Sequence, residues 1–346
     1  MFNMSYYIKA ILFLFSCFAV VITCCFFCYK KDLSLPTKET IEKTKLTIGI
    51  NGHPLNQLAY TKMSLSTQFE ILKKKKFRQY RFDVPIDYNG NIKNEATFFE
   101  MTTIAQQNKI DLLPMIYMLG LNFNDDETSS FDKGYLICDT FVKKYGAYIN
   151  YYELGNEEDL LITKSGTSGS DPEDYDQDKL KVVAAFWKGM IAAIKHQKPD
   201  AKIIINTGGW FHYVFFDLLT KHNVAYDIIG YHWYSKMDEY AQSVHVDLLD
   251  ILSKKFHKPI WLTEINQSNG SDLYTEGKQA AWIKAFINTC RGYPLVKAVF
   301  IYELLDEPDL PNVDESERHY GIIKWTTKSK SNLNDWHYKK AAQIFD

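Results

Sequence analysis

The sequence predicts an α/β fold, a (β/α)8 TIM barrel, and two observations lead to it. From Leu46 to the C-terminus, short runs rich in β-branched and aromatic residues alternate with longer helical patterns. Eight such strands, each followed by a helical stretch, over about 300 residues match the count and size of this fold. The chain has 346 residues, 46% of them hydrophobic, which is enough to bury one large core. We therefore expect residues 46–346 to form a single barrel domain.

The expected strands are mostly continuous apolar runs, as parallel strands buried on both faces require. They are Leu46–Asn51, Gln79–Val84, Asp111–Met118, Tyr151–Glu157, Lys202–Thr207, Tyr226–Tyr234, Ile260–Asn266 and Lys297–Leu304.

The expected helices between them include Glu95–Gln107, Lys179–Lys198, Glu239–Phe256 and Glu276–Arg291, with Asp335–Phe345 as the closing helix. A doubly wound sheet is the structural alternative. That fold carries a glycine-rich phosphate turn after its first strand, whereas residues 49–53 read Gly-Ile-Asn-Gly-His and do not form the required G-x-G-x-x-G pattern.

The N-terminal segment has a different character. Ala10 to Cys28 is apolar apart from two hydroxyl residues. This run is longer than the apolar region of a secretory signal peptide, ~7–15 residues, and matches the length of a membrane-spanning helix, ~17–25 residues. We expect residues 1–31 to be a signal anchor or signal peptide and residues 32–45 to be a polar linker. Residues 14–17, Leu-Phe-Ser-Cys, loosely resemble a bacterial lipobox, so lipidation of Cys17 stays open. The expected location is extracytoplasmic, membrane-anchored or secreted, in the periplasm or at the cell surface.

Charge and cysteine content limit the function classes. A formal net charge of -2 gives no basic field for nucleic acid. After the N-terminal segment only Cys138 and Cys290 remain, which is neither a disulfide framework nor a metal motif. We expect both to pack in helices as small apolar residues. The sequence thus predicts no cofactor and no metal, and we expect a monomer that contacts a membrane through the N-terminal segment.

The active site of a TIM barrel lies at the C-terminal ends of its strands. Polar, charged and aromatic residues gather there, which a purely structural barrel would not require. They are Asn51, His53, Arg81, Asp83, Asn156, Glu157, Trp210, His232, Trp233, Tyr234, Glu264 and Glu303.

Glu157 and Glu264 stand out because each follows a strongly apolar strand. Hydrolysis of an acetal needs two carboxyl groups, one to protonate the leaving oxygen and one to attack the anomeric carbon or activate water. A separation of ~5–5.5 Å gives retention and ~6.5–9.5 Å gives inversion. The sequence alone leaves both outcomes open.

Two motifs carry a family resemblance. Tyr-Glu-Leu-Gly-Asn-Glu (152–157) at the fourth strand and Trp-Leu-Thr-Glu (261–264) at the seventh resemble the clan A glycoside hydrolases. Residues 300–308, Phe-Ile-Tyr-Glu-Leu-Leu-Asp-Glu-Pro, and His-Tyr-Gly-Ile-Ile (319–323) make the family 39 group the most similar. The resemblance covers the chain from Leu46 onward. It implies retaining chemistry, with Glu157 as acid/base and Glu264 as nucleophile.

The resemblance also implies substrate-binding roles. Asn156 would bind the sugar 2-hydroxyl, Arg81 and Tyr234 would keep Glu264 ionised, and His232 would line the −1 sugar site. Trp210, Glu303 and His53 would be further substrate contacts. Glu157 should stay protonated, which requires dry and more acidic surroundings. Family 39 xylosidases carry a β-sandwich beside the barrel, for which this chain leaves no room, so their substrate is not carried over.

Several alternatives remain at this stage. Arg81 could form a structural ion pair with Asp83, His232 could be a core histidine, and Glu153 and Glu158 are rivals of Glu157. The protein could instead be a catalytically silent, membrane-tethered carbohydrate-binding barrel. It could also be a metal-dependent hydrolase, although His53, His232 and Asp83 form no known metal signature. The sugar, its linkage and endo or exo attack stay open.

Overall fold

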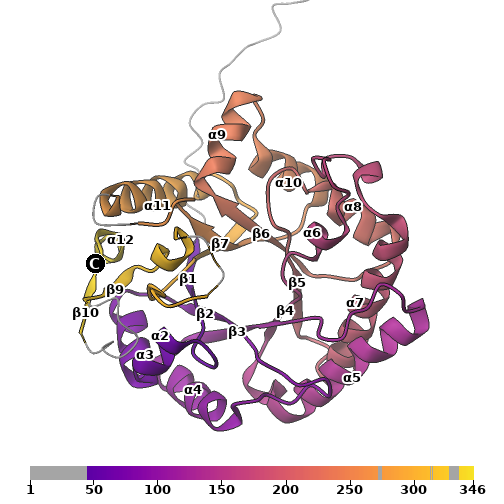
Figure 1. Ribbon diagram of the computed structural model, residues 1–346, viewed down its shortest axis with the longest axis horizontal. Coiled ribbons are helices and arrows are strands. Elements are labelled where there is room, and N and C mark those ends of the chain that lie inside the picture. Colours follow the sequence, from indigo (N-terminus) through magenta and orange to yellow (C-terminus); the bar gives the residue numbers. More distant parts are fainter. Residues whose placement is uncertain (1–44, 272–274, 312, 314, 327–334) are drawn as a thin grey trace, which may run out of the picture. The chain divides into compact units, whose positions relative to one another are not determined.

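The structure is a computed structural model that describes residues 45–271, 275–311, 313, 315–326 and 335–346. Eight parallel strands close into one barrel in chain order, which confirms the predicted fold (Figure 1). The described residues belong to one compact unit, Lys43–Asp346. The barrel strands are β1 (Thr47–Gly52), β2 (Gln79–Asp83), β3 (Asp111–Ile116), β4 (Tyr151–Leu154), β5 (Lys202–Ile205), β6 (Ile228–Tyr234), β7 (Ile260–Asn266) and β8 (Val296–Ile301).

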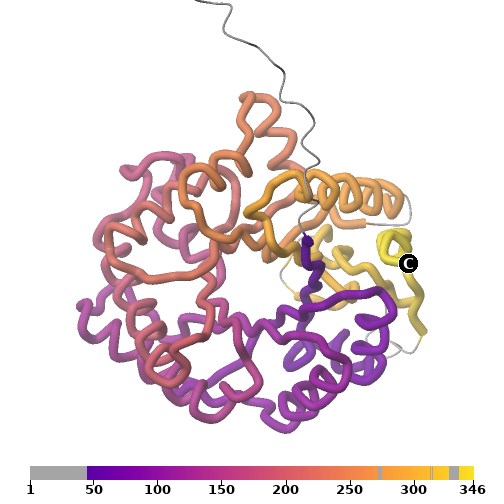
Figure 2. Tube along the Cα trace, turned by 180° about the vertical axis from the view of Figure 1, so that it is seen from behind, coloured from indigo at the N-terminus to yellow at the C-terminus, as the bar shows by residue number. Residues whose placement is uncertain are grey.

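Helices surround the strands, and Figure 2 shows the same ring from behind, where β1 begins. The helices are α2 (Leu58–Lys62), α3 (Leu65–Lys74), α4 (Glu95–Asn108), α5 (Glu127–Tyr145), α6 (Glu158–Ile162), α7 (Gln177–Gln197), α8 (Val214–Lys221), α9 (Ser235–Ser243), α10 (Leu248–Phe256), α11 (Glu276–Cys290) and α12 (Lys340–Gln343). Their apolar faces pack on the outside of the strands in one large buried cluster. Cys138 in α5 and Cys290 in α11 are both buried and free, as predicted.

A second apolar cluster is built from the inward-facing residues of the strands, among them Ile204, Trp261 and Phe300. Side chains two residues apart on a strand point to the same side. The inward layer above Ile204 therefore begins with Asn206, at the C-terminal end of the barrel. A Cβ atom at Gly49 would lie 2.4 Å from the Phe300 ring, so glycine there lets the ring fill the interior. The apolar layer closes the barrel below the polar residues and leaves the site open at one end only.

Three expected elements differ from the structure. The helix predicted at Glu239–Phe256 is two helices, α9 and α10, because His245 adopts a positive φ of 58° and Asp247 caps a new helix. The closing helix predicted at Asp335–Phe345 is wrong for most of its length. Residues Trp336–Tyr338 form strand β10, which pairs antiparallel with β9 (Ile323–Trp325), and only the short α12 follows.

The fourth predicted strand also ends early. β4 stops at Leu154, and Gly155 takes a φ of 79° that turns the chain before Glu157.

The N-terminal predictions fall on residues 1–44, which lie outside the described part of the chain. Within the described residues, no helix is both long and apolar enough to cross a membrane.

Candidate active site

Arg81 lies at the centre of the C-terminal end of the barrel, buried on β2. Its Nε donates to Glu153, with which it forms an ion pair. Its Nη1 donates to Asn51 Oδ1 at 2.7 Å and to Glu264 Oε1 at 2.8 Å, and its Nη2 donates to Asn156 Oδ1 at 2.9 Å. The structural pair with Asp83 is therefore not formed. Arg81 joins four strand ends and fixes the orientation of Glu264.

Glu264 is held by donors on both of its carboxylate oxygens. Arg81 bonds Oε1, and the Tyr234 hydroxyl donates to Oε2 at 2.8 Å. Burial and the neighbouring Glu264 raise the pKa of Tyr234 well above its usual range, so this hydroxyl remains a donor. The Glu264 side chain is only 10% exposed. A carboxylate fixed in this way has one direction in which it can act, toward the open end of the barrel.

Glu157 reaches the site through a tight turn after β4. Its φ is 61°, in a region that costs a non-glycine residue about 1–3 kcal/mol, and its backbone N–H donates to Asn206 Oδ1 at 2.8 Å. Asn206 also donates to Glu153 at 2.7 Å and to the Gly155 carbonyl at 3.1 Å. Asn206 thus holds the turn in place and aims the Glu157 side chain, 28% exposed, over the barrel end.

His232, fully buried on β6, lies between the two glutamates. Its Nδ1 is 2.6 Å from Glu157 Oε1 and 3.5 Å from Glu264 Oε2. One nitrogen of His232, one carboxylate oxygen of Glu157 and one of Glu264 all lie within 4.8 Å of one another. His232 is therefore part of the site and not a separate core histidine.

Glu157 lies beside positively charged groups, whereas the sequence predicted more acidic surroundings for it. Burial alone would raise the pKa of Glu157, but the His232 imidazolium and the Arg81 guanidinium outweigh it and lower that pKa. Burial likewise opposes protonation of His232, yet Glu264 and Glu157 raise its pKa above the usual value. In the free protein the shared proton therefore belongs mainly to His232.

Comparison with known proteins agrees with this geometry. Residues 120–344, which include both glutamates, match the sequence profile of glycosyl hydrolase family 53. The chain belongs to glycosyl hydrolase family 53. It is a glycosidase, and the clan A resemblance is confirmed, whereas the closer placement in the family 39 group is not.

Solved structures share the fold of this family 53 glycosidase. A β-glucosidase from Thermotoga maritima in complex with a calystegine derivative has a TM-score of 0.63 at 12% identity, covering 87% of this chain and 97% of that one. The β-glycosidase BGL167 has a TM-score of 0.62 at 10% identity, covering 87% and 95%. No protein with a curated description matches the sequence.

The two rival glutamates of this family 53 chain occupy other places. Glu153 is fully buried inside the barrel in its ion pair with Arg81. Glu158 lies behind the Gly155 turn, where burial raises its pKa to about 8. Neither is held against His232 and Glu264 as Glu157 is.

His53 and Glu303 form a second cluster beside the glutamate pair. His53 Nδ1 lies 2.6 Å from Asp83 Oδ1, and the Tyr60 hydroxyl donates to Glu303 Oε2 at 2.5 Å. Burial raises the pKa of Glu303 well above its usual range, and Asp83 raises that of His53 to about 10 against the opposing effect of burial. Because His232 belongs to the other cluster, the metal-dependent site of His53, His232 and Asp83 is not assembled.

Exposed aromatic side chains surround the open end of the barrel. Trp210, which follows β5, is 42% exposed and its ring meets Tyr240 of α9 edge-on at 6.0 Å. Tyr117, just after β3, has an exposed part as well. The buried part of its side chain raises its pKa most, Glu264 raises it further and Arg81 lowers it, so its hydroxyl lies near both charges. Tyr117 and Asn206 were not among the predicted site residues. Their position directly after an apolar strand is the signal that could have identified them.

Proposed function

We propose that this family 53 glycosidase cleaves O-glycosidic bonds of an oligo- or polysaccharide with retention of configuration. Glu264 is the nucleophile and Glu157 the acid/base. The supporting observation is the short separation of the two carboxylates, since one oxygen of Glu157 lies within 4.8 Å of one oxygen of Glu264, beside His232. Retaining enzymes have a separation of ~5–5.5 Å, whereas inverting enzymes need ~6.5–9.5 Å to admit a water molecule. The short oxygen–oxygen distance favours the retaining arrangement.

In the first step Glu264 attacks the anomeric carbon while the glycosidic oxygen takes a proton from Glu157. Arg81 and Tyr234 orient the attacking carboxylate, each from 2.8 Å. The resulting glycosyl ester on Glu264 is then hydrolysed by water, which gives its proton to Glu157.

The proton for the first step is held by the Glu157–His232 pair. At 2.6 Å, the hydrogen bond between His232 Nδ1 and Glu157 Oε1 lets one proton pass between them. Substrate bound over the site excludes water, which disfavours two separate charges and favours the neutral pair. His232 is therefore the positioning residue and proton partner of Glu157.

Substrate contacts follow from the remaining geometry. Because Asn156 accepts from Arg81 through Oδ1, its amide NH₂ faces away from Arg81, and we propose that it donates to the sugar 2-hydroxyl. The exposed rings of Trp210 and Tyr240 offer apolar faces to sugar C–H groups. Their position at the rim supports a substrate longer than one sugar. The T. maritima β-glucosidase has been solved with cyclophellitol, which supports a carbohydrate ligand for this fold.

We also propose that residues 1–31 direct the protein out of the cytoplasm and that the enzyme acts on extracellular glycans. The apolar run from Ala10 to Cys28 supports this part of the proposal.

Glu157→Gln and Glu264→Gln variants test the assignment. Hydrolysis should fall by several orders of magnitude in Glu264→Gln with any leaving group. In Glu157→Gln it should fall most with poor leaving groups, which need the acid. Glu158→Gln is the matched control and should stay within a few-fold of wild type. Full activity of either main variant on a panel of polysaccharides and aryl glycosides contradicts the assignment.

A further inference from the structure

His53, Glu303 and Glu307 converge next to the catalytic pair. One ligand atom from each lies within 4.8 Å of the other two. Glu303 is fully buried and Glu307 is 2% exposed. Buried carboxylates are costly unless they are paired, bonded or bound to a metal. The basic side chain that faces both of them is His53.

The hydrogen bonds around this cluster leave atoms unused where the three residues meet. His53 Nε2 and Glu303 Oε1 are buried, and neither has a hydrogen-bond partner among the described residues. His53 Nε2 lies 3.5 Å from Glu303 Oε2. Two ligands bound at about 2.1 Å to a tetrahedral ion stand about 3.4 Å apart. The observed spacing lets both residues serve as ligands of one small ion, in place of the ion pair between them.

The neighbouring residues are arranged like the outer shell of a metal site. Asp83 accepts from His53 Nδ1 at 2.6 Å and from Asn56 at 2.6 Å, which leaves Nε2 as the nitrogen that faces Glu303. A metal ion that binds there displaces the Nε2 proton. A carboxylate that orients a histidine in this way is a recurring feature of zinc sites. The Tyr60 hydroxyl fixes Glu303 from the other side at 2.5 Å.

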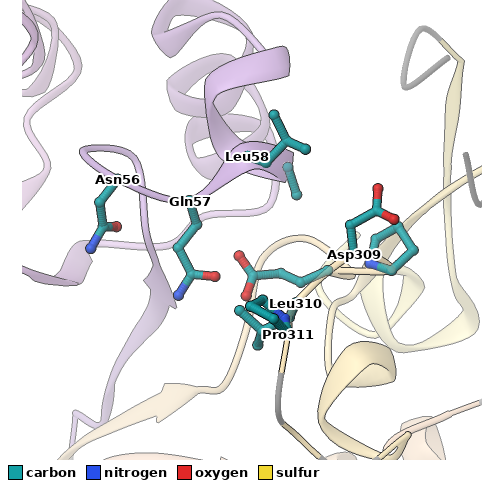
Figure 3. A pocket seen from close by; sticks show the side chains of 9 residues that line it. Asn56, Gln57, Leu58, Asp309, Leu310 and Pro311 are labelled. Atoms are coloured by element: carbon teal, nitrogen blue, oxygen red, sulfur yellow. The ribbon is translucent and has the colours of Figure 1, made fainter. Parts of the chain in front are cut away.

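A surface pocket borders the cluster at Glu307. It has a volume of about 170 Å³, and Glu307 is one of its lining residues. Figure 3 shows Asn56, Gln57 and Leu58 on one side and Asp309 to Pro311 on the other. The Gln57 amide lies directly against the Glu307 carboxylate. An ion could enter here without crossing the catalytic centre.

We propose that His53, Glu303 and Glu307 bind one divalent transition-metal ion of the zinc class. One imidazole nitrogen and two carboxylates suit such an ion, whereas calcium prefers a larger, all-oxygen set. Glu307, at the pocket, closes the remaining distance by side-chain rotation, and water from the pocket fills the fourth position. The ion neutralises the buried carboxylates and ties β1 to the segment after β8. It takes no part in the double displacement.

The test uses the full-length protein after dialysis against a chelator, titrated calorimetrically with ZnCl₂ and spectroscopically with CoCl₂. We expect one equivalent to bind and cobalt to give visible absorption bands of a nitrogen- and oxygen-ligated site. Glu303→Gln and Glu307→Gln should each weaken binding at least ~10-fold, and Asp83→Asn ~10–100-fold. Asp178→Asn, which changes an exposed carboxylate, should bind as wild type does.

Glu264→Gln separates this site from the catalytic one. It should bind the metal normally although it is inactive. Loss of binding in Glu264→Gln would place the ion at Glu157, His232 and Glu264 and overturn the proposal. Absence of both heat and cobalt bands in the wild-type protein up to millimolar metal overturns it as well, and that result needs no variant to fold. It would mean that Glu303 and Glu307 share a proton instead.

Discussion

Replacing His232 with asparagine separates the two partners that hold the catalytic proton. In the proposed mechanism one proton is shared across the 2.6 Å contact between His232 and Glu157, and such a pair titrates as a unit. Glu264 and Glu157 raise the pKa of His232, against the effect of burial. The pair therefore keeps its proton, and the enzyme its acid, until the pH rises above the usual value for histidine.

In His232→Asn the proton must be held by Glu157 alone. Burial, the larger effect, raises the pKa of this carboxyl and the nearby Arg81 lowers it, so its pKa lies above the ordinary value of glutamate. The ordinary pKa values of histidine and glutamate, ~6.5 and ~4.3, differ by about 2 units. Because the pKa of His232 is raised as well, the alkaline limb of kcat/KM should move to lower pH by about 2 units. At pH 7 this corresponds to a loss of about 100-fold.

The assay is kcat/KM between pH 4 and 9 on an aryl glycoside with a poor leaving group. A dinitrophenyl glycoside is the control substrate, because its leaving group departs without a proton and its alkaline limb should not move. The matched control variant is His222→Asn, which removes a partly buried histidine at the C-terminal end of α8. An alkaline limb that stays in place in His232→Asn with the poor leaving group refutes the shared-proton account.

Three further predictions concern the residues around the glutamates. Arg81→Met leaves Glu153 and Glu264 without their cation, so the free energy of unfolding in urea should fall by about 3–5 kcal/mol. The control Arg78→Met changes an exposed side chain and should stay within about 0.5 kcal/mol of wild type. Equal urea midpoints of unfolding for the two variants would contradict the central role of Arg81. Tyr234→Phe removes one hydrogen bond to the charged Glu264, and such a bond contributes about 1.5–3 kcal/mol. We expect kcat/KM to fall ~10–100-fold with an unchanged melting temperature. An unaltered kcat/KM would argue against a role of the Tyr234–Glu264 hydrogen bond in catalysis. Trp210→Ala should lower kcat/KM on polysaccharide but not on aryl monosaccharides. The control Tyr148→Ala removes an exposed aromatic side chain after α5 and should change neither value. Equal losses on both substrates in Trp210→Ala would contradict a role of Trp210 in binding the extended sugar chain.

The barrel and the glutamate pair could be predicted because both depend on local patterns. Continuous apolar runs indicate parallel strands, and a carboxylate directly after such a run lies at the open end of the barrel. Ile260–Asn266 was predicted with the limits that β7 has. The closing helix failed because its pairing partner, Ile323–Trp325, decides the conformation of Trp336–Tyr338.

The electrostatics of the site could not be predicted in the same way. Strand alternation correctly put Arg81 and Asp83 on the inner face, but their partners come from other strands. Arg81 pairs with Glu153 and Glu264, and Asp83 pairs with His53. The lowered pKa of Glu157 depends on His232, which only the closed barrel brings within reach.

The stereochemistry of the first product tests the central claim most directly. An NMR time course of hydrolysis follows the anomeric proton before mutarotation mixes the two forms. Because one oxygen of Glu157 lies within 4.8 Å of one oxygen of Glu264, we expect the first sugar released to have the same anomeric configuration as the substrate. Initial release of the opposite anomer would contradict the double displacement and the role of Glu264 as nucleophile.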